Sequence, residues 1–195
     1  FRMHPAGAQG HLGVTPDLCV LGKAFGGGMP ISALTGTRRV MEHLRPLGDS
    51  EMSGTYLAHL TAVKAARAAL REYSRARFYE ELNARGDRFY HHFQDAIDRS
   101  DVPLRLQYLG PRFGLYFGVT GTVSNYRDAA AQDRDMLMTF IAACFERGVY
   151  LAVSPHHGFS AAHTDADLDR VVEVFADALG EVRRIHAGKG ARHGG

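Results

Sequence analysis

The chain has 195 residues, of which 45% are hydrophobic and 23% are charged, and this composition predicts a folded protein rather than a disordered one. Its 23 basic and 21 acidic residues are interleaved, so they do not favour a nucleic-acid-binding surface. The sequence has no apolar run long enough for a transmembrane helix and no signal-peptide core, so we expect no membrane partner and a cytoplasmic location. Both cysteines, Cys19 and Cys144, lie in apolar runs and are expected to be buried free thiols.

The first hundred residues predict an α/β layer structure. Residues 18–21 form a short continuous apolar run, the pattern of a strand buried on both faces in a parallel sheet. Glycine-rich residues separate this run from a second expected strand at 31–35. Helices are then expected at 38–44, where Pro46 and Gly48 end the helix, at 57–73 and at 76–98.

From about residue 101 the pattern changes to a smaller α+β arrangement. The expected elements are strands at 104–109 and 113–119 about a Gly110-Pro111 turn, a helix at 128–147 that Gly148 ends, a strand at 149–153, a short strand at 159–162 within a loop, and a helix from Thr164 to 185. We therefore expect the C-terminal part of a large domain at 1–100, a small C-terminal domain at 101–187, and a frayed tail at 188–195.

The stretch PDLCVLGKAFGGGMP places Lys23 after an apolar run and shortly before a triple glycine. It does not fit a phosphate-binding loop, because Asp17 and Ala24 stand where glycine and a hydroxyl residue are needed, nor a dinucleotide fingerprint, because Ile31 replaces the last glycine. Two interpretations remain. The lysine stem lies along a sheet edge with its amine in water, or the amine is a nucleophile at the mouth of an apolar site, where glycines let a planar ring approach the backbone.

The segment GAQGHLGVTPDLCVLGKAFGGGMPISALTGTRRVME strongly resembles the lysine segment of class III aminotransferases, which are fold-type I enzymes that use pyridoxal 5'-phosphate (PLP). The likeness is greatest to the glutamate-1-semialdehyde aminomutase-like members of the family. It resumes at SGTY (53–56) and at GFSAAHTDADLDR (158–170), and extends to about Arg184. The resemblance implies an α/β fold, with part of a PLP-binding large domain built on a mostly parallel sheet and a small C-terminal α+β domain.

The resemblance also implies a site. Lys23 corresponds to the family's Schiff-base lysine, which holds the cofactor and later shuttles a proton at the α-carbon of the substrate. Thr55, with Gly54, corresponds to a threonine that contacts the cofactor phosphate of the neighbouring subunit, so the resemblance implies a homodimer and a small-molecule amino or keto substrate. From the residues alone, Thr55 would be interpreted as a turn or a helix cap.

The chain departs from the family pattern in two ways. Relatives carry Ser-Gly-Asn-Pro before the following helix, where this chain has Leu57-Ala58-His59-Leu60. The resemblance also places the family's pyridine-binding aspartate, phosphate loop and ring-stacking aromatic residue upstream of Phe1. We therefore expect the C-terminal part of a longer enzyme, inactive without an N-terminal half; the alternative is a non-catalytic remnant that keeps the fold and the dimer surface but binds no cofactor.

Other polar and aromatic candidates are interpreted as structural. His156, His157 and His163 have no acidic or thiol partner at a metal-ligand spacing, so no metal is expected and His163 is assigned a capping or surface role. Arg112 could bind a carboxylate, but an exposed turn arginine is the commoner case. The aromatic residues near the predicted strands and loops, which are Tyr56, Tyr116 and Phe117, are assigned to the core.

Overall fold

The computed structural model describes residues 2–154 and 156–187. The chain divides into two compact units, residues 1–81 and residues 82–195, and the division falls near the start of helix α4 (Phe78–Ser100). The sequence analysis placed its domain boundary later, at residue 100. The tail assigned to 188–195 lies outside the described residues.

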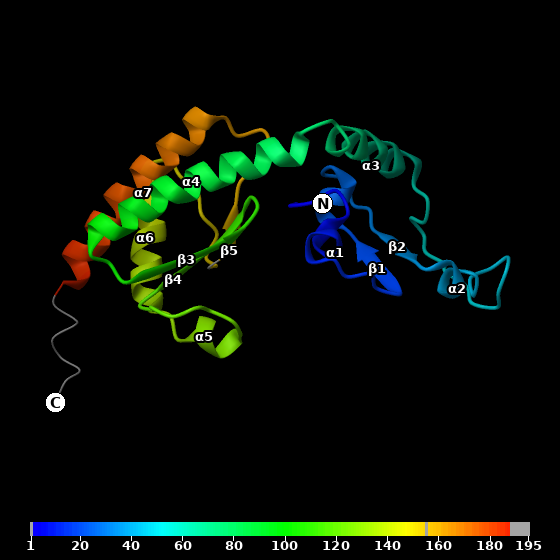
Figure 1. The fold of residues 1–195 in the computed structure, drawn as a ribbon, viewed down its shortest axis with the longest axis horizontal. Helices are drawn as coiled ribbons and strands as arrows, with labels where there is room; N and C mark the ends of the chain where they lie inside the picture. The colour runs from blue at the N-terminus through cyan, green and yellow to red at the C-terminus, as the bar shows by residue number, and fades with distance from the viewer. Residues whose placement is uncertain (1, 155, 188–195) are drawn as a thin grey trace. The chain divides into compact units, whose positions relative to one another are not determined.

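The first unit is a strand pair with helices on either side of it in the sequence (Figure 1). In chain order its elements are α1 (Gly7–Leu12), β1 (Leu18–Leu21), the 3₁₀ turn η1 (Lys23–Gly26), β2 (Ala33–Gly36), α2 (Arg38–Met41), α3 (Leu60–Tyr73) and the first residues of α4. The helix expected at 57–73 thus begins at Leu60, and the strand expected at 31–35 begins at Ala33.

Strand β1 lies where the apolar run predicted a strand, but its surroundings differ from the prediction. It pairs with β2 in antiparallel register, from Leu18 opposite Gly36 to Leu21 opposite Ala33, and β2 is its only strand neighbour among the described residues. None of its residues is fully buried, and Val20 is 75% exposed. The expectation of a parallel strand buried on both faces is therefore wrong for this chain, and Cys19, expected to be buried, is half-buried.

Residues 57–60, which depart from the Ser-Gly-Asn-Pro that the resemblance implies, lead into α3. Ala58 has a φ of 56°, in the left-handed region that glycine adopts without a steric cost. His59 is the N-cap of α3, and its Nδ1 accepts a hydrogen bond of 3.4 Å from the Ala62 amide, although asparagine is a preferred residue at an N-cap. Leu60 occupies the first helical position, where proline is favoured. The local backbone would therefore suit Gly-Asn-Pro better than the residues present.

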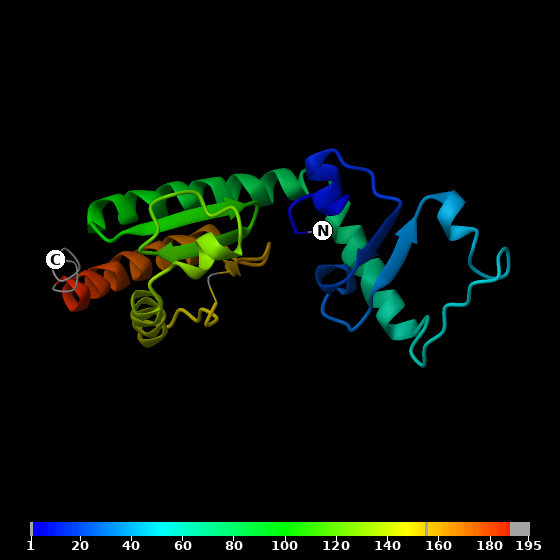
Figure 2. The same cartoon turned by 90° about the horizontal axis from the view of Figure 1, so that it is seen from below.

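The second unit is an antiparallel sheet with helices over one face (Figures 1 and 2). Strands β3 (Leu104–Leu109), β4 (Arg112–Phe117) and β5 (His156–Gly158) lie in the order β3-β4-β5. Its helices are the rest of α4, α5 (Tyr126–Ala130), α6 (Arg134–Glu146) and α7 (Asp165–His186). The β3–β4 hairpin and α7 confirm the predicted elements almost residue for residue.

The core of the second unit lies between the sheet and α4, α6 and α7. On β4 the side chains of Phe113, Leu115 and Phe117 enter the core, and the rings of Phe93 on α4 and Phe175 on α7 meet at 4.6 Å between centroids. Phe175 is completely buried. Because these buried side chains come from every layer of the unit, their burial stabilises the unit as a whole.

Three predictions for the second unit are wrong in detail. The helix expected at 128–147 is broken into α5 and α6, because Asp133 caps a new helix and accepts a hydrogen bond of 2.9 Å from the Met136 amide. No strand forms at 149–153, where the Val149 amide instead donates to the Cys144 carbonyl at the end of α6, and the short strand lies at β5 rather than at 159–162. The Thr164 cap is confirmed as a capping box with Asp167.

Candidate active site

Lys23 lies directly beyond β1 and is the first residue of η1. Its backbone has a φ of 53°, in the left-handed region where the side chain of an L-residue crowds the backbone. The side chain is exposed rather than packed. Strained residues of this kind persist only where the surroundings hold them, and they cluster at functional sites. The strain therefore supports a role for Lys23 beyond that of an ordinary surface lysine.

A cavity of about 350 Å³ borders Lys23 within the first unit. It falls in the size range of small-molecule sites. Residues of the N-terminal segment and α1 form one wall and the end of β1 forms the other; the lining residues are Arg2, Met3, Ala6, Gly7, Ala8, Gln9, Cys19, Val20, Leu21, Gly22, Lys23 and Ala24. The side-chain oxygen of Gln9 is buried and has no hydrogen-bond partner among the described residues. An unsatisfied acceptor beside an amine is a polar feature suited to a ligand.

Two of the three glycines after Lys23, Gly26 and Gly27, are packed closely, whereas Gly28 has open space beside it. A Cβ on Gly26 would lie 2.8 Å from Cγ2 of Ile31, and a Cβ on Gly27 would lie 2.8 Å from the Cβ of Ala69 on α3. Gly27 also has a φ of 57°. At these two positions the chain's own side chains occupy the space that the sequence analysis assigned to a planar ring. Glycine is required there for close packing and for the turn.

The structure does not bring Gly54 and Thr55 to the cavity beside Lys23. Both lie in the exposed segment before α3, where the Gly54 carbonyl accepts a hydrogen bond of 3.0 Å from the Leu57 amide. Neither is among the described residues that line that cavity. Their position is that of an exposed turn, which leaves Thr55 accessible to a second molecule. Tyr56, expected in the core, is 79% exposed.

The histidines that the structure describes in the second unit do not form a metal centre. No group of three His, Cys, Asp or Glu side chains in the described part of the chain is arranged to hold a metal ion. His163 closes its own loop, because its Nδ1 accepts a hydrogen bond of 3.1 Å from the Ser160 amide. His157 is buried on β5, and its burial, with smaller effects of Arg112 and His156, lowers its pKa to about 4. Burial likewise raises the pKa of the Cys144 thiol to about 12, so that thiol is not a nucleophile.

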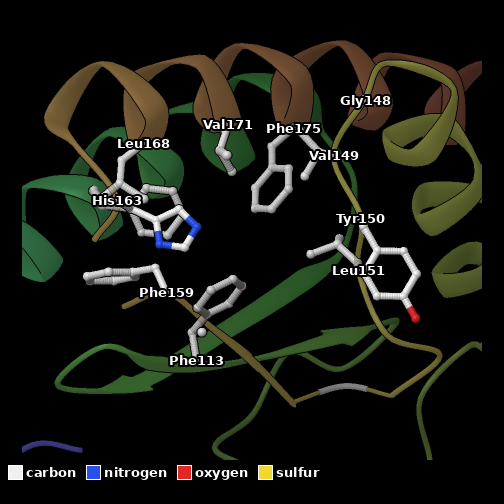
Figure 3. A pocket seen from close by; sticks show the side chains of 12 residues that line it. Phe113, Gly148, Val149, Tyr150, Leu151, Phe159, His163, Leu168, Val171 and Phe175 are labelled. Carbon is white, nitrogen blue, oxygen red and sulfur yellow. The ribbon is translucent and has the colours of Figure 1, made fainter. Parts of the chain in front are cut away.

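The second unit contains an apolar cavity of about 310 Å³ (Figure 3). Figure 3 shows the rings of Phe113, Phe159 and Phe175 pointing into it, with His163 beside Leu168 at one end. No amine, thiol or carboxylate lines this cavity among the described residues. It therefore lacks the groups for covalent chemistry that the cavity beside Lys23 has.

The opposite face of the β3-β4-β5 sheet carries polar groups. Arg112, Tyr116 and His156 line a shallow cavity of about 250 Å³ there. The Tyr116 ring lies over Gly114, where a Cβ would come within 2.9 Å of the tyrosine hydroxyl oxygen. Tyr116 is thus buried against its own strand, while Phe117 enters the core as expected. Sequence reasoning missed Gln9 and Tyr73, whose hydroxyl contacts η1, because neither stands in a pattern that marks it from the residues alone.

A comparison with known families identifies the class of protein. The Aminotransferase class-III family matches residues 6–179, and the chain belongs to this family. The predicted α/β fold of a partial PLP transferase is confirmed, and the resemblance on which the prediction depended is confirmed with it.

Individual proteins of known sequence or structure are also similar to this chain. A glutamate-1-semialdehyde 2,1-aminomutase of Laribacter hongkongensis (strain HLHK9) is 40% identical over 184 residues, which are 93% of this chain and 43% of that protein. An omega-transaminase from Sphaerobacter thermophilus has a similar structure, with a TM-score of 0.82 and 26% identity over 93% of this chain and 42% of the other. The PLP internal aldimine form of the Sphingopyxis sp. MTA144 FumI protein gives a TM-score of 0.80 with 26% identity, over 96% of this chain and 42% of the other. The chain thus spans under half the length of these relatives.

Proposed function

We propose that the chain is the lysine-bearing part of a PLP-dependent aminotransferase or aminomutase that acts on a small amino or keto compound. The observation that carries the proposal is the left-handed backbone of Lys23 at the edge of a cavity, in a chain of the class III aminotransferase family. A strained lysine beside a cavity of this size fits a nucleophilic amine better than a lysine that only solvates a sheet edge.

The residues of the first unit fit the cofactor. Lys23 supplies the amine that would hold the PLP aldehyde carbon, and Gln9, in the other wall of the cavity, supplies a buried acceptor that has no hydrogen-bond partner among the described residues. When bound, PLP provides an electron sink for the substrate carbanion. With PLP in place, Lys23 Nζ would be the group of this chain that takes up and returns the proton at the substrate α-carbon. The cavity wall from α1 and β1 shields part of that space from water.

The exposed turn at Gly54 and Thr55 has its role in a second subunit. A hydroxyl and backbone amides suit a phosphate, and both residues are accessible on the surface of the first unit. We assign Thr55 and Gly54 to the cofactor phosphate of the partner subunit in a homodimer. A cytoplasmic location belongs to the same proposal; the structure contributes only that none of its described helices has the length and apolar character to cross a membrane.

Reductive labelling tests the proposed function. The chain has three lysines, Lys23, Lys64 and Lys189, so PLP followed by borohydride and peptide mass spectrometry assigns every pyridoxyl group to one residue. We expect label on Lys23 in excess over Lys64, an exposed lysine of α3, together with an absorption band in the violet before reduction. Lys23→Ala should abolish the band and Lys64→Ala should keep it. Equal labelling of Lys23 and Lys64 without a band, also when an N-terminal half is supplied separately, would instead favour the non-catalytic remnant.

A further inference from the structure

We propose that Tyr73 is a positioning residue that holds the backbone of Lys23 in its left-handed conformation. Tyr73 is the last residue of α3, and its hydroxyl donates a hydrogen bond of 2.8 Å to the carbonyl of Ala24, the residue after Lys23. The two partners are 49 residues apart in the sequence. The inference rests on the proposed function of Lys23, and it adds a residue outside the lysine segment to the site.

The carbonyl of Ala24 is the point at which the turn is closed. It accepts a second hydrogen bond, of 3.2 Å, from the Gly27 amide, and the Phe25 amide donates to the Gly22 carbonyl at 3.1 Å. These two backbone bonds shape a tight turn, but both lie within the turn itself. The Tyr73 bond is the one that ties this carbonyl to a helix and so fixes the turn against its surroundings.

The same face of α3 also contacts the η1 turn at a second position, Gly27. Ala65, Ala69 and Tyr73 are spaced by four residues and therefore share one stripe of the helix. A Cβ on Gly27 would meet the Cβ of Ala69 at 2.8 Å and the carbonyl oxygen of Ala65 at 3.5 Å. Figure 2 shows α3 running across the β1–β2 pair, beside η1. The stripe thus contacts the turn at Gly27 and hydrogen-bonds it at Ala24.

This arrangement accounts for the strain at Lys23. A left-handed L-residue relaxes toward the ordinary regions unless its neighbours prevent it. Rotation at Lys23 would move the Ala24 carbonyl away from the Tyr73 hydroxyl, so keeping that bond keeps the φ of Lys23 positive. The conformation in turn sets the direction in which the side chain leaves the strand end, at the border of the cavity that Lys23 lines. Tyr73 therefore acts on the reaction through Lys23 and not by touching the ligand.

The test is Tyr73→Phe in the full 195-residue chain, which removes the hydroxyl and keeps the ring beside Phe78. We expect the ratio of pyridoxyl label on Lys23 to that on Lys64, after brief exposure to PLP and borohydride, to fall about two- to tenfold, the effect of one lost hydrogen bond. Hydrogen exchange at the Phe25 and Gly27 amides should accelerate by a similar factor. Tyr126→Phe, at an 84% exposed ring in α5, is the matched control and should change neither quantity.

A second variant makes the test independent of the tyrosine. Gly27→Ala should also lower the Lys23 to Lys64 ratio, because its Cβ meets Ala69 and its φ is 57°, while Tyr73 is intact. If wild type is selective for Lys23 and Tyr73→Phe stays equally selective, the positioning role is overturned while the proposed function stands. If wild type itself shows no selectivity, the proposed function fails and the positioning role fails with it. A purely structural role would instead change the labelling of Lys23 and Lys64 together and leave their ratio intact.

Discussion

The two units differ in where their apolar side chains lie. In the second unit every layer contributes to one core, which includes fully buried Phe93, Phe140 and Phe175. In the first unit the buried hydrophobic side chains among the described residues are those of Ala62, Ala66 and Phe78, while larger ones on β1 and before α3 are exposed. The unit that carries Lys23, the proposed reactive lysine, is therefore the one with little core of its own. Exposed apolar surface of this kind is suited to being covered by more protein, as the proposed homodimer requires.

The largest difference between the two units should be in the loss of stability when one apolar side chain is removed from each. Phe175→Ala leaves a cavity in a closed core and should lower the free energy of unfolding of the second unit by about 3–5 kcal/mol. Val20→Ala, at a side chain that is 75% exposed, should change the stability of the isolated chain by less than about 0.5 kcal/mol. Urea unfolding followed by circular dichroism measures both. Equal losses would show that the first unit has a core that the exposed fractions do not reveal.

The next effect is the dependence of the second unit on pH. The pKa of His157 is lowered to about 4 by burial, so the unfolded chain takes up a proton at a higher pH than the folded one. The free energy of unfolding should therefore fall as pH drops from about 6.5 toward 4, and His157→Leu should flatten that fall. His91→Ala, at an exposed histidine of α4, should keep the wild-type slope. An unchanged slope in His157→Leu would assign the pH dependence to other groups.

A smaller effect is expected at the start of α7. Thr164 and Asp167 form a reciprocal capping box, and the Asp167 amide donates a hydrogen bond of 3.1 Å to the threonine hydroxyl. Thr164→Ala should cost about 1 kcal/mol of stability in the second unit, while Thr164→Ser should cost much less. Thermal unfolding of the two variants provides the comparison. If serine does not restore the loss, the methyl group of Thr164 and not its hydroxyl is responsible.

The smallest expected effect is an increase in stability, and it concerns the first unit. Ala58→Gly removes the strain of a left-handed alanine, which should stabilise the folded chain by about 1–2 kcal/mol. The extra conformational freedom of glycine in the unfolded chain should offset about 0.4–1 kcal/mol of this stabilisation. The net gain of about 0.5–1 kcal/mol should appear as slower hydrogen exchange in the first turns of α3. Ala66→Gly, in the interior of α3, is the control and should accelerate exchange. Faster exchange in Ala58→Gly would mean that the alanine is not strained.

Several features could be predicted because their cause is local in the sequence. The apolar stripe of α4, the Gly110-Pro111 turn between β3 and β4, and the Thr164 cap are each specified within a few residues. The lysine segment, by its resemblance to class III aminotransferases, placed Lys23 after a strand, where the structure has it. The break at Asp133 also had a local signal, because aspartate is a preferred N-cap residue, but the prediction of a single long helix did not use it.

By itself, then, the sequence determined the family, most of the helices and the β3–β4 hairpin, and the position of Lys23 after a strand. The tertiary structure decided that β1 pairs antiparallel and stays exposed, that residues 149–153 join no sheet, and that Lys23 is left-handed. The physical reason is the distance along the sequence over which each kind of interaction acts. Propensities, caps and turns act over a few residues, whereas strand pairing and the Tyr73 bond to Ala24 join positions far apart in the chain, and no local pattern records which partner each group will meet.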